Sequence, residues 1–428
     1  MVTVTAIIAL LATTHATLSG GRSGPPMLPV ATKPPQAADA HLTPTTTDTG
    51  HQPHPTTPDS APTVPNAGSP FDSPGASQPT DCVAATMAAM SMQERASQLL
   101  MVGTPIANPT TFAATLRRYP VGGVFLAGRT SQSASTLRRR IRLLQQEASA
   151  GGTAPLHVAI DQEGGLVQTL KGPDFPTIPP AVTQGSWGTP QLRATTLDWA
   201  KRLVDTGVTI DLAPVADTVP AGFAPSNPPI GALGRQLGSA PEDVATDIAV
   251  IVDAAQTTGL LTTLKHFPGL GRVAVNTDSS NKAVDPEATA QDPYLVPFAR
   301  GIEAGSGAVM VSLALYPSLD SHSIAAFSTP IITGLLRQHM GYRGLVVSDD
   351  LGAAAAVKSL PVGERAVRFV RAGGDMVLTV RTSDAGPMIE ALVSAAKNSP
   401  TFAARVADAA RHVLVSKYRA GILTCPAR

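Results

Sequence analysis

The sequence has almost no excess charge of either sign, which limits the partners that the protein can bind by charge alone. Its 32 lysine and arginine residues nearly balance 31 aspartate and glutamate residues, so the formal net charge is +1. No basic block dominates the chain. Because nucleic-acid binding requires the neutralisation of many backbone phosphates, the sequence gives that function no support.

Long apolar runs are also missing beyond the first residues, as is a dinucleotide-binding motif. No later stretch reaches the about 20 consecutive apolar residues that a membrane helix needs. No Gly-x-Gly-x-x-Gly sequence follows the first predicted strand, which argues against a dinucleotide fold. Hydrophobic residues make up 43% and charged residues 15% of the chain. This composition favours a large buried core under a lightly charged surface.

The first 81 residues predict an exported protein with a tether. Residues 2–12 form an apolar run that is too short to span a bilayer and is typical of a signal peptide, although a basic segment before it is missing. We therefore predict a signal-peptide-like segment at 1–20, with a disordered apolar tail as the alternative. Residues 21–81 are rich in Pro and Thr and predict a disordered linker. The expected location is outside the cell or in the cell envelope.

From residue 82 onward, short apolar runs alternate with amphipathic segments. The runs predict eight strands buried on both faces, at 99–103, 122–128, 156–161, 209–217, 260–267, 308–316, 344–350 and 375–380. The clearest helices are predicted at 133–149, 194–207, 241–259, 365–374 and 385–398. Eight strands that alternate with helices predict a single α/β domain over 82–428, a (β/α)8 barrel of the TIM type. A doubly wound open sheet is the alternative.

The chain has only two cysteines, and they lie at the two ends of the predicted domain. The first and last elements of a closed barrel are neighbours, so Cys82 and Cys425 are placed for a disulfide, which fits an oxidising compartment. Two unrelated free thiols are the alternative reading.

Polar residues end four of the predicted strands, at the face where barrels place their functional groups. The third strand runs into Asp161 and Glu163, the fourth ends at Asp217, the fifth ends in Lys265-His266, and the seventh ends in Asp349-Asp350. This pattern predicts a site for a polar substrate.

Several of these carboxylates also have structural explanations. Asp350 is placed to cap the segment that follows it. Glu163 is placed to pair with a basic side chain in the barrel wall, and Asp217 is placed to order a loop. The Lys265-His266 pair is harder to explain structurally, because a partly buried lysine is costly without a partner or a substrate.

Four motifs occur in a specific order: IDQEGG, LAPVAD, LKHFPGLG and LVVSDDLG. With these motifs, residues 82–428 resemble the family 3 glycoside hydrolases, and most closely the single-barrel bacterial β-N-acetylglucosaminidases. The resemblance implies that Asp349 is the nucleophile. It also implies sugar-binding roles for a further set of residues, namely Asp161, Arg235, Lys265 and His266. We expect a nearby lysine and arginine to keep Asp349 ionised.

The sequence departs from the family pattern around one part of this site. The family places an Asp-Ser-His triplet in the loop after KHFPG, where the histidine is the general acid and base. Here Ser280 occupies the position of this histidine. A hydroxyl is too weak an acid to replace imidazole. Other family polar positions are apolar or uncharged in this chain: Leu166, Thr169, Leu270 and Leu313.

Three explanations of the missing histidine stay open. Asp278 on the same loop is the candidate substitute proton donor, because a buried carboxyl can have a raised pKa. Alternatively, the protein hydrolyses only substrates with good leaving groups, or it binds carbohydrate without turnover in the cell envelope. We expect a monomeric retaining β-N-acetylhexosaminidase that acts on amino-sugar glycosides such as cell-wall fragments, with no metal or organic cofactor. A β-glucosidase specificity is a further alternative.

Overall fold

Short, continuously apolar segments form eight parallel strands that curve into a barrel. The computed structural model describes residues 79–150 and 154–424. The barrel strands are β1 (Leu100–Pro105), β2 (Gly123–Ala127), β3 (His157–Ile160), β6 (Ile210–Asp211), β7 (Leu261–Phe267), β8 (Ala308–Val311), β11 (Leu345–Ser348) and β12 (Val377–Thr379). Their order in the sheet is β11-β8-β7-β6-β3-β2-β1-β12, and every pair of neighbours is parallel.

The two ends of this sheet meet and close the barrel. Val347 in β11 pairs in parallel with Met376, immediately before β12. Across the same junction the Ser348 N–H donates to the Met376 carbonyl at 3.0 Å, and the Asp375 N–H donates to the Val346 carbonyl at 2.9 Å. The predicted (β/α)8 barrel is confirmed, and the doubly wound open sheet is excluded.

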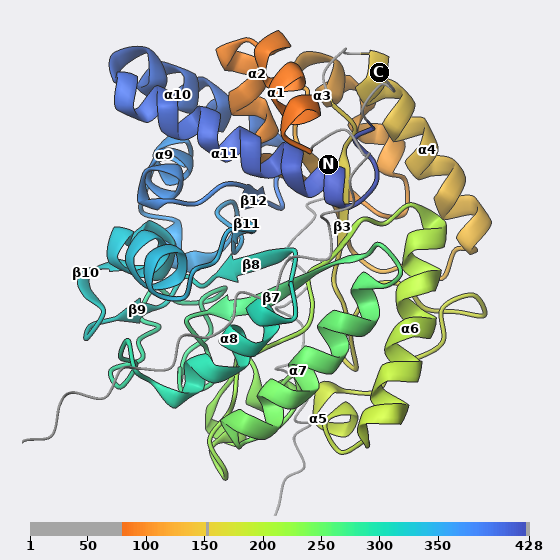
Figure 1. Ribbon diagram of the computed structural model, residues 1–428, viewed down its shortest axis with the longest axis vertical. Helices are drawn as coiled ribbons and strands as arrows, with labels where there is room; N and C mark the ends of the chain where they lie inside the picture. Colours follow the sequence, from red (N-terminus) through yellow and green to blue (C-terminus); the bar gives the residue numbers. More distant parts are fainter. Residues whose placement is uncertain (1–78, 151–153, 425–428) are drawn as a thin grey trace, which may run out of the picture. The chain divides into compact units, whose positions relative to one another are not determined.

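Helices surround the strands (Figure 1). The α-helices are α1 (Pro79–Ala89), α2 (Met92–Gln98), α3 (Ala113–Arg118), α4 (Ala134–Ala150), α5 (Ala181–Gln184), α6 (Thr189–Thr206), α7 (Pro241–Gln256), α8 (Val296–Glu303), α9 (Val362–Ala372), α10 (Ala385–Asn398) and α11 (Pro400–Arg419). The ten-residue η6 (Pro330–His339) has π-type hydrogen bonding. The short 3-10 turns are η1 (Pro109–Phe112), η2 (Ala224–Ser226), η3 (Gly231–Leu233), η4 (Pro293–Leu295), η5 (Ala325–Phe327), η7 (Ala355–Val357) and η8 (Thr382–Asp384).

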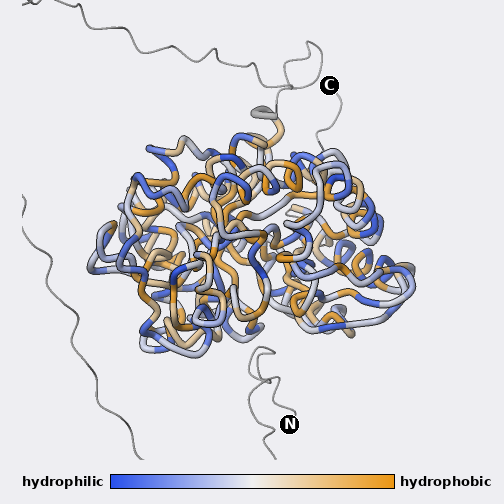
Figure 2. The backbone as a smooth tube through the Cα atoms, turned by 90° about the horizontal axis from the view of Figure 1, so that it is seen from below, coloured by the Kyte–Doolittle hydropathy of each residue, from blue (hydrophilic) through white to orange (hydrophobic). Residues whose placement is uncertain are grey.

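The side-chain pattern explains how the helices and strands form two cores. Helix α4 buries residues at helical spacing: Leu137, Ile141, Leu144 and Ala148. Along the strands, alternate residues point into the barrel or toward the helices. Met101, Phe125 and Met310 belong to the inner core, whereas Val102 belongs to the core under the helices. Apolar segments accordingly lie mostly inside the molecule in Figure 2.

Two strands are much shorter than predicted. The segment predicted as a strand at 209–217 has regular pairing only in β6, because Pro214 has no N–H to donate to the ladder. The strand predicted at 308–316 ends at Val311, and β9 (Leu315–Tyr316) instead pairs antiparallel with β10 (Asp320–Ile324). A second small hairpin joins β4 (Gln162–Gly164) to β5 (Val167–Gln168).

The two ends of the described chain lie together. Helices α1 and α2 pack on α11 (Figure 1). Helix α1 begins at Pro79, close to the predicted domain start at residue 82. Cys82 is buried in a small apolar cluster with Leu414 and Leu423. Its proposed partner Cys425 lies outside the described residues, as do the predicted signal segment and nearly all of the predicted linker.

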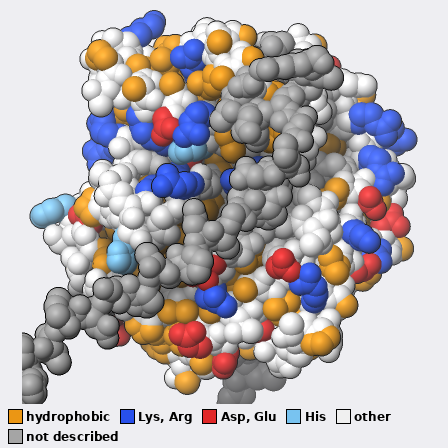
Figure 3. Space-filling model, viewed as in Figure 1, with side chains coloured by type: hydrophobic (Ala, Val, Ile, Leu, Met, Phe, Trp, Pro, Cys, Tyr) orange, Lys and Arg blue, Asp and Glu red, His pale blue; other side chains and the backbone are white. Residues whose placement is uncertain are grey.

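The surface carries charges of both signs. On the face drawn in Figure 3, basic and acidic side chains are interspersed over the described part of the molecule. No helix in residues 79–150 or 154–424 has the length and hydropathy needed to cross a membrane.

Candidate active site

The carboxyl ends of β3, β7 and β11 carry the polar residues that the sequence singled out. Asp161 follows β3, Lys265 and His266 lie near the end of β7, and Asp349 follows β11. Arg235 reaches the same region from the loop after η3. The parallel strands therefore bring together side chains that are far apart in the sequence, as expected for a barrel.

Lys265 lies at the centre of an ion cluster. Its ammonium is 2.9 Å from Asp161 Oδ1 and 2.5 Å from Glu163 Oε1, and the residue is only 2% exposed. Burial alone would lower the pKa of Lys265, but the two carboxylates outweigh it and raise the pKa. The lysine is therefore held charged inside the barrel mouth.

Glu163 joins the lysine to the arginine. Arg235 donates to both Glu163 oxygens, with Nε–Oε2 at 2.8 Å and Nη2–Oε1 at 2.7 Å, and it also donates to the Pro229 carbonyl at 2.8 Å. Burial would raise the pKa of Glu163, but Arg235 and Lys265 together lower it to about 2. The structural explanation of Glu163, a pairing with basic side chains, is thus confirmed, and Glu163 is the residue that connects the predicted binding residues.

His266 is oriented by a fully buried carboxylate. Asp217 Oδ2 lies 2.7 Å from His266 Nδ1, and Asp217 Oδ1 accepts from the His266 N–H at 3.0 Å and the Leu270 N–H at 2.8 Å. The predicted role of Asp217 in ordering a loop is confirmed. Because Asp217 engages Nδ1, Nε2 is the ring nitrogen left for a ligand.

Asp278 lies within electrostatic range of Asp349. Burial raises the pKa of Asp278 to about 6, and the negative charge of Asp349 adds to the shift, while Arg235 and His266 act in the opposite direction. Asp349 is partly exposed, and its N–H donates to the Val311 carbonyl at 3.0 Å. Two neighbouring carboxyl groups, one of which has a raised pKa, are what a pair of acid and base groups requires.

The two cations expected near Asp349 have other direct partners. The sequence predicted that a lysine and an arginine would keep this carboxylate ionised. The direct ion pairs of Lys265 and Arg235 instead go to Asp161 and Glu163. The reason is geometric, because the β4 hairpin places Glu163 between the two cations.

Asp350 has the structural role that its position suggested. Its oxygens accept from the Gly352 N–H at 2.8 Å, the Ala353 N–H at 2.9 Å and the Val380 N–H at 3.0 Å. It therefore shapes the turn after β11 and ties that turn to the end of β12.

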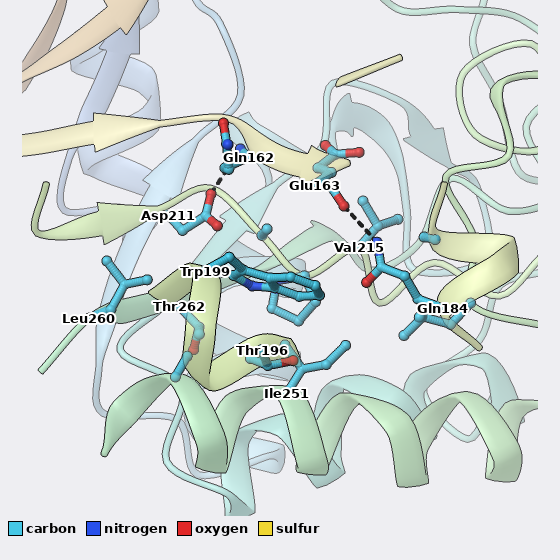
Figure 4. A pocket seen from close by; sticks show the side chains of 15 residues that line it. Gln162, Glu163, Gln184, Thr196, Trp199, Asp211, Val215, Ile251, Leu260 and Thr262 are labelled. Atoms are coloured by element: carbon cyan, nitrogen blue, oxygen red, sulfur yellow. Dashed lines mark hydrogen bonds between the residues drawn. The ribbon is translucent and has the colours of Figure 1, made fainter. Parts of the chain in front are cut away.

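A small cavity lies beside the ion cluster, between the barrel and helices α6 and α7 (Figure 4). Trp199 crosses its centre, and Asp211 and Glu163 border it. Its volume of about 30 Å³ is enough for one or two water molecules but not for a sugar.

Asp211 is a buried carboxyl that the sequence analysis did not identify. Its Oδ1 accepts from the Gln162 N–H at 3.0 Å. Burial raises the pKa of Asp211 to about 7, against the opposing effect of Lys265. The one available signal was an acidic residue inside an otherwise apolar strand.

The residues that depart from the family pattern differ in their surroundings. Leu270 and Leu313 are buried among apolar side chains, whereas Leu166 is 50% exposed at the β4–β5 hairpin. Thr169 is buried. The Ser280 hydroxyl accepts a hydrogen bond from the Lys282 N–H at 3.1 Å. Within the described ranges, no cluster of three or more His, Cys, Asp or Glu residues is arranged to hold a metal ion.

Comparison with known proteins places this arrangement in a family. The model of the glycosyl hydrolase family 3 N-terminal domain matches residues 91–415. A β-hexosaminidase of Xanthomonas oryzae pv. oryzae is 33% identical over 277 residues, which cover 61% of this chain and 77% of that protein. The β-hexosaminidase LpqI of Mycobacterium tuberculosis is 30% identical over 315 residues, which cover 72% of this chain and 78% of that protein.

A solved structure agrees with these relatives. The crystal structure of a β-N-acetylhexosaminidase from Beutenbergia cavernae superimposes with a TM-score of 0.75 at 40% sequence identity, and the match covers 77% of this chain and 99% of that one. The chain therefore belongs to glycosyl hydrolase family 3 and is an O-glycosyl hydrolase.

Proposed function

We propose that this protein is a retaining β-N-acetylhexosaminidase in which Asp349 is the nucleophile and Asp278 is the general acid and base. The observation that carries the proposal is the position of these two carboxyl groups. Asp349 directly follows β11, and the Asp278 carbonyl accepts at 3.1 Å from the Ala355 N–H in the loop that follows Asp349. In a retaining glycosidase the two carboxyl groups flank the bond that is cleaved and have unequal acidities.

The proposed reaction has two steps. Protonated Asp278 gives its proton to the glycosidic oxygen while an Asp349 carboxylate oxygen bonds to the anomeric carbon and the bond to the leaving group breaks. Asp278, now ionised, then accepts a proton from water as the water oxygen attacks the anomeric carbon and releases Asp349. The raised pKa of Asp278, about 6, allows it to serve as the acid at mildly acidic pH.

The remaining residues would bind and orient the sugar. Asp161 and Lys265 form a charged pair that can accept from and donate to ring hydroxyls. His266, with Nδ1 engaged by Asp217, would donate or accept through Nε2. Glu163 holds Arg235 and Lys265 in place, so we assign it a positioning role between two sugar-binding cations.

The substrate class rests on the relatives. Their names describe them as β-hexosaminidases and a β-N-acetylhexosaminidase. We infer amino-sugar glycosides, such as fragments of a cell wall, as the substrates of this chain. Leu166 is one of the uncharged residues at positions that are charged in the family pattern. A β-glucoside specificity is therefore the alternative.

Four substrates separate these possibilities. We expect turnover of an activated aryl β-N-acetylglucosaminide and of a β-linked N-acetylglucosamine disaccharide, and little turnover of the matching aryl β-glucoside and glucose disaccharide. Faster cleavage of the glucosides would overturn the amino-sugar assignment. Sugar binding with no turnover of any of the four would identify a carbohydrate-binding protein instead.

Variants at the two carboxyl groups test the roles. Asp349→Ala should abolish turnover of every substrate. Asp278→Ala should lose turnover of the disaccharide, and added azide should restore turnover of the activated glycoside, because azide attacks the glycosyl-enzyme without needing a general base. Unchanged kinetics in Asp278→Ala would remove it as the proton donor.

We also propose that the protein is exported, monomeric and closed by a disulfide between Cys82 and Cys425. The burial of Cys82 where α1 meets α11 supports a bond to a cysteine that follows α11. Peptide mapping of the unreduced, exported protein should find the linked pair, and light scattering should give the mass of one chain. A reducible dimer, or two alkylated cysteines before reduction, would contradict these assignments.

A further inference from the structure

The loop that carries Asp278 is fastened to the loop that follows Asp349. The Ala355 N–H donates to the Asp278 carbonyl at 3.1 Å, and the Ala356 N–H donates to the Thr277 carbonyl at 3.2 Å. These are two successive backbone hydrogen bonds between two loops that come from β7 and β11. We call this pair of hydrogen bonds the loop bridge.

On the Asp278 side, Asn276 holds the turn. Its Oδ1 accepts from the Asp278 N–H at 2.8 Å, and its carbonyl accepts from the Ser279 N–H at 3.2 Å and the Ser280 N–H at 3.0 Å. Thr277, between Asn276 and Asp278, is buried. The backbone of Asp278 is therefore bonded at both its N–H and its carbonyl.

Asn227, from another segment of the chain, holds the start of the loop that carries Asp278. Its side-chain amide donates to the carbonyls of Leu270 and Val273, each at 2.8 Å. Asn227 is itself fully buried. The segment between the end of β7 and Asp278 is thus held by a second, independent group.

On the Asp349 side, the next residue supplies the support. Asp350 accepts from the N–H groups of Gly352 and Ala353 and from that of Val380 at the end of β12. Ala354 and Val357, which flank the two donors of the loop bridge, are buried. The turn that Asp350 holds is thus followed closely along the chain by the residues that bond to the backbone of Asp278.

We propose that Asn276 and the loop bridge are positioning elements that hold Asp278 at a fixed place relative to Asp349 before substrate binds. This inference rests on the proposed function, because it assigns the two carboxyl groups to acid and nucleophile. Neither Asn276 nor Ala355 touches the reacting atoms in this account. Both act through Asp278, and fixing a catalytic group before the reaction lowers the barrier that must be crossed.

Ala355→Pro tests the loop bridge with little strain elsewhere. Ala355 is the first residue of η7, and the preceding Ala354 has φ −57° and ψ 135°, which is the conformation that proline favours before it. Proline removes the N–H that Asp278 accepts from, and its ring occupies that space. The matched control is Val362→Pro at the first residue of α9, where the preceding residue has φ −54° and ψ 142°.

The diagnostic readout is the dependence on leaving group. We expect Ala355→Pro to reduce kcat/KM for the disaccharide by about tenfold or more, and to change it by less than about threefold for the activated aryl glycoside, which needs little acid assistance. Val362→Pro should leave both values close to wild type. Equal losses on both substrates, or no loss on either, would overturn the proposal.

Asn276 provides a second pair of variants. Asn276→Ala removes the acceptor for the Asp278 N–H and should show the same selective loss on the disaccharide. Asn276→Asp keeps an acceptor and should restore much of that loss, with the alkaline limb of the pH profile moved upward, because the added negative charge favours protonated Asp278. Similar kinetics in Asn276→Ala and wild type would contradict the positioning role.

A measurement without turnover separates this inference from the function. Carboxyl NMR can follow the titration of Asp278 in wild type and in Ala355→Pro. Release of the loop should bring the pKa of Asp278 down from about 6 toward the ordinary aspartate value. An unchanged titration would overturn the loop bridge even for an active enzyme, whereas a shifted titration in an inactive protein would contradict only the proposed function.

Discussion

The roles that we propose for Asp278 and Asp349 differ although the two residues are of the same type. Partial burial and the negative charge of Asp349 raise the pKa of Asp278 to about 6, so its protonated form is favoured. Asp349 lies at a strand end and is partly exposed. The proposed division into acid and nucleophile therefore depends on the surroundings of each carboxyl group and not on the residue type.

Asp349→Asn should lower the pKa of Asp278. The carboxylate of Asp349 is one cause of the raised value of about 6, and an amide at that position carries no charge. Carboxyl NMR titration of the variant should therefore show Asp278 ionising at lower pH than in the wild type. In the active enzyme, kcat for the disaccharide should fall as pH rises through about 6, where the acid loses its proton. No movement of the Asp278 titration in the variant would show that the two groups are not coupled.

Glu163→Gln should destabilise the fold. Glu163 is buried, and it is the common partner of Lys265 and Arg235. Removing one member of a buried ion cluster costs about 3 to 5 kcal/mol in the free energy of unfolding, because the remaining charges lose their compensation. Denaturant unfolding measures the loss. Glu147→Gln, which removes an exposed pair with Arg117, is the control and should cost less than about 1 kcal/mol.

The sequence predicted the positions of several site residues but not their partners. Strand-end position was enough to place a set of polar residues at one face of the barrel, because parallel strands point the same way; they are Asp161, Lys265, His266 and Asp349. The partners of the charges could not be predicted in that way. Whether Lys265 pairs with Glu163 or with Asp349 depends on how the β4–β5 hairpin folds over the barrel, and no sequence period encodes it.

One buried carboxylate lies where four elements of the fold meet: β11, β12, η6 and α11. Asp375 is fully buried and bonded to three basic side chains and to the Val346 N–H at 2.9 Å. The three are Arg337, Arg405 and His412. Burial would raise the pKa of Asp375, but these partners lower it to about 2. The junction that closes the barrel therefore depends on one ionised group.

Asp375→Asn should destabilise the protein by about 3 to 5 kcal/mol near neutral pH, because it leaves the basic side chains together without their carboxylate. The pKa is lower in the folded state than the ordinary 3.8, so the stabilisation is complete above about pH 4 and is lost as pH falls through about 2. Unfolding measured between pH 6 and pH 2.5 should show the difference from wild type shrinking at the acid end. A constant difference would contradict this account, and Asp408→Asn, at an exposed partner of Arg405, is the control.

At the same scale, the predicted elements were confirmed in type and differed in length. All eight predicted strands are present, because a buried parallel strand needs an apolar run that is easily recognised. The strand predicted at 209–217 was too long because the apolar run continues past Pro214, which cannot donate to the ladder. The hairpin of β9 and β10 was missed because β9 continues the apolar run of β8, while the sequence of β10 is mostly polar.

Over the whole molecule, α11 covers the end of the barrel opposite the site. Val413 of this helix belongs to the inner core, and Ser416 lies 2.8 Å from His157 at the start of β3. Lys417 is fully buried, and its ammonium donates to Gln98 Oε1 at 2.5 Å. Burial lowers the pKa of Lys417 to about 7. The sequence pattern predicted the closed barrel but not this covering helix, whose apolar face is like that of any other helix.

Lys417→Met should stabilise the protein. The folded-state pKa of about 7 is below the ordinary 10.5, so the cost of burying the lysine is greatest below pH 7 and fades as pH rises toward 10.5. We expect a gain on the order of 1 kcal/mol or more at pH 6 and a smaller gain at pH 10. Denaturant unfolding at both values measures it. A loss of stability at pH 6 would show that the hydrogen bond to Gln98 outweighs the burial cost, and Lys397→Met on the exposed side of α10 is the control.

The most direct test of the central claim is to trap the glycosyl-enzyme and locate the bond. A fluorinated, activated N-acetylglucosaminide slows the second step, so that the labelled protein can be digested and mapped by mass spectrometry. The account predicts one sugar per chain, attached to Asp349, and no label in Asp349→Ala. A label on another carboxylate, or rapid turnover with inversion at the anomeric carbon, would contradict it.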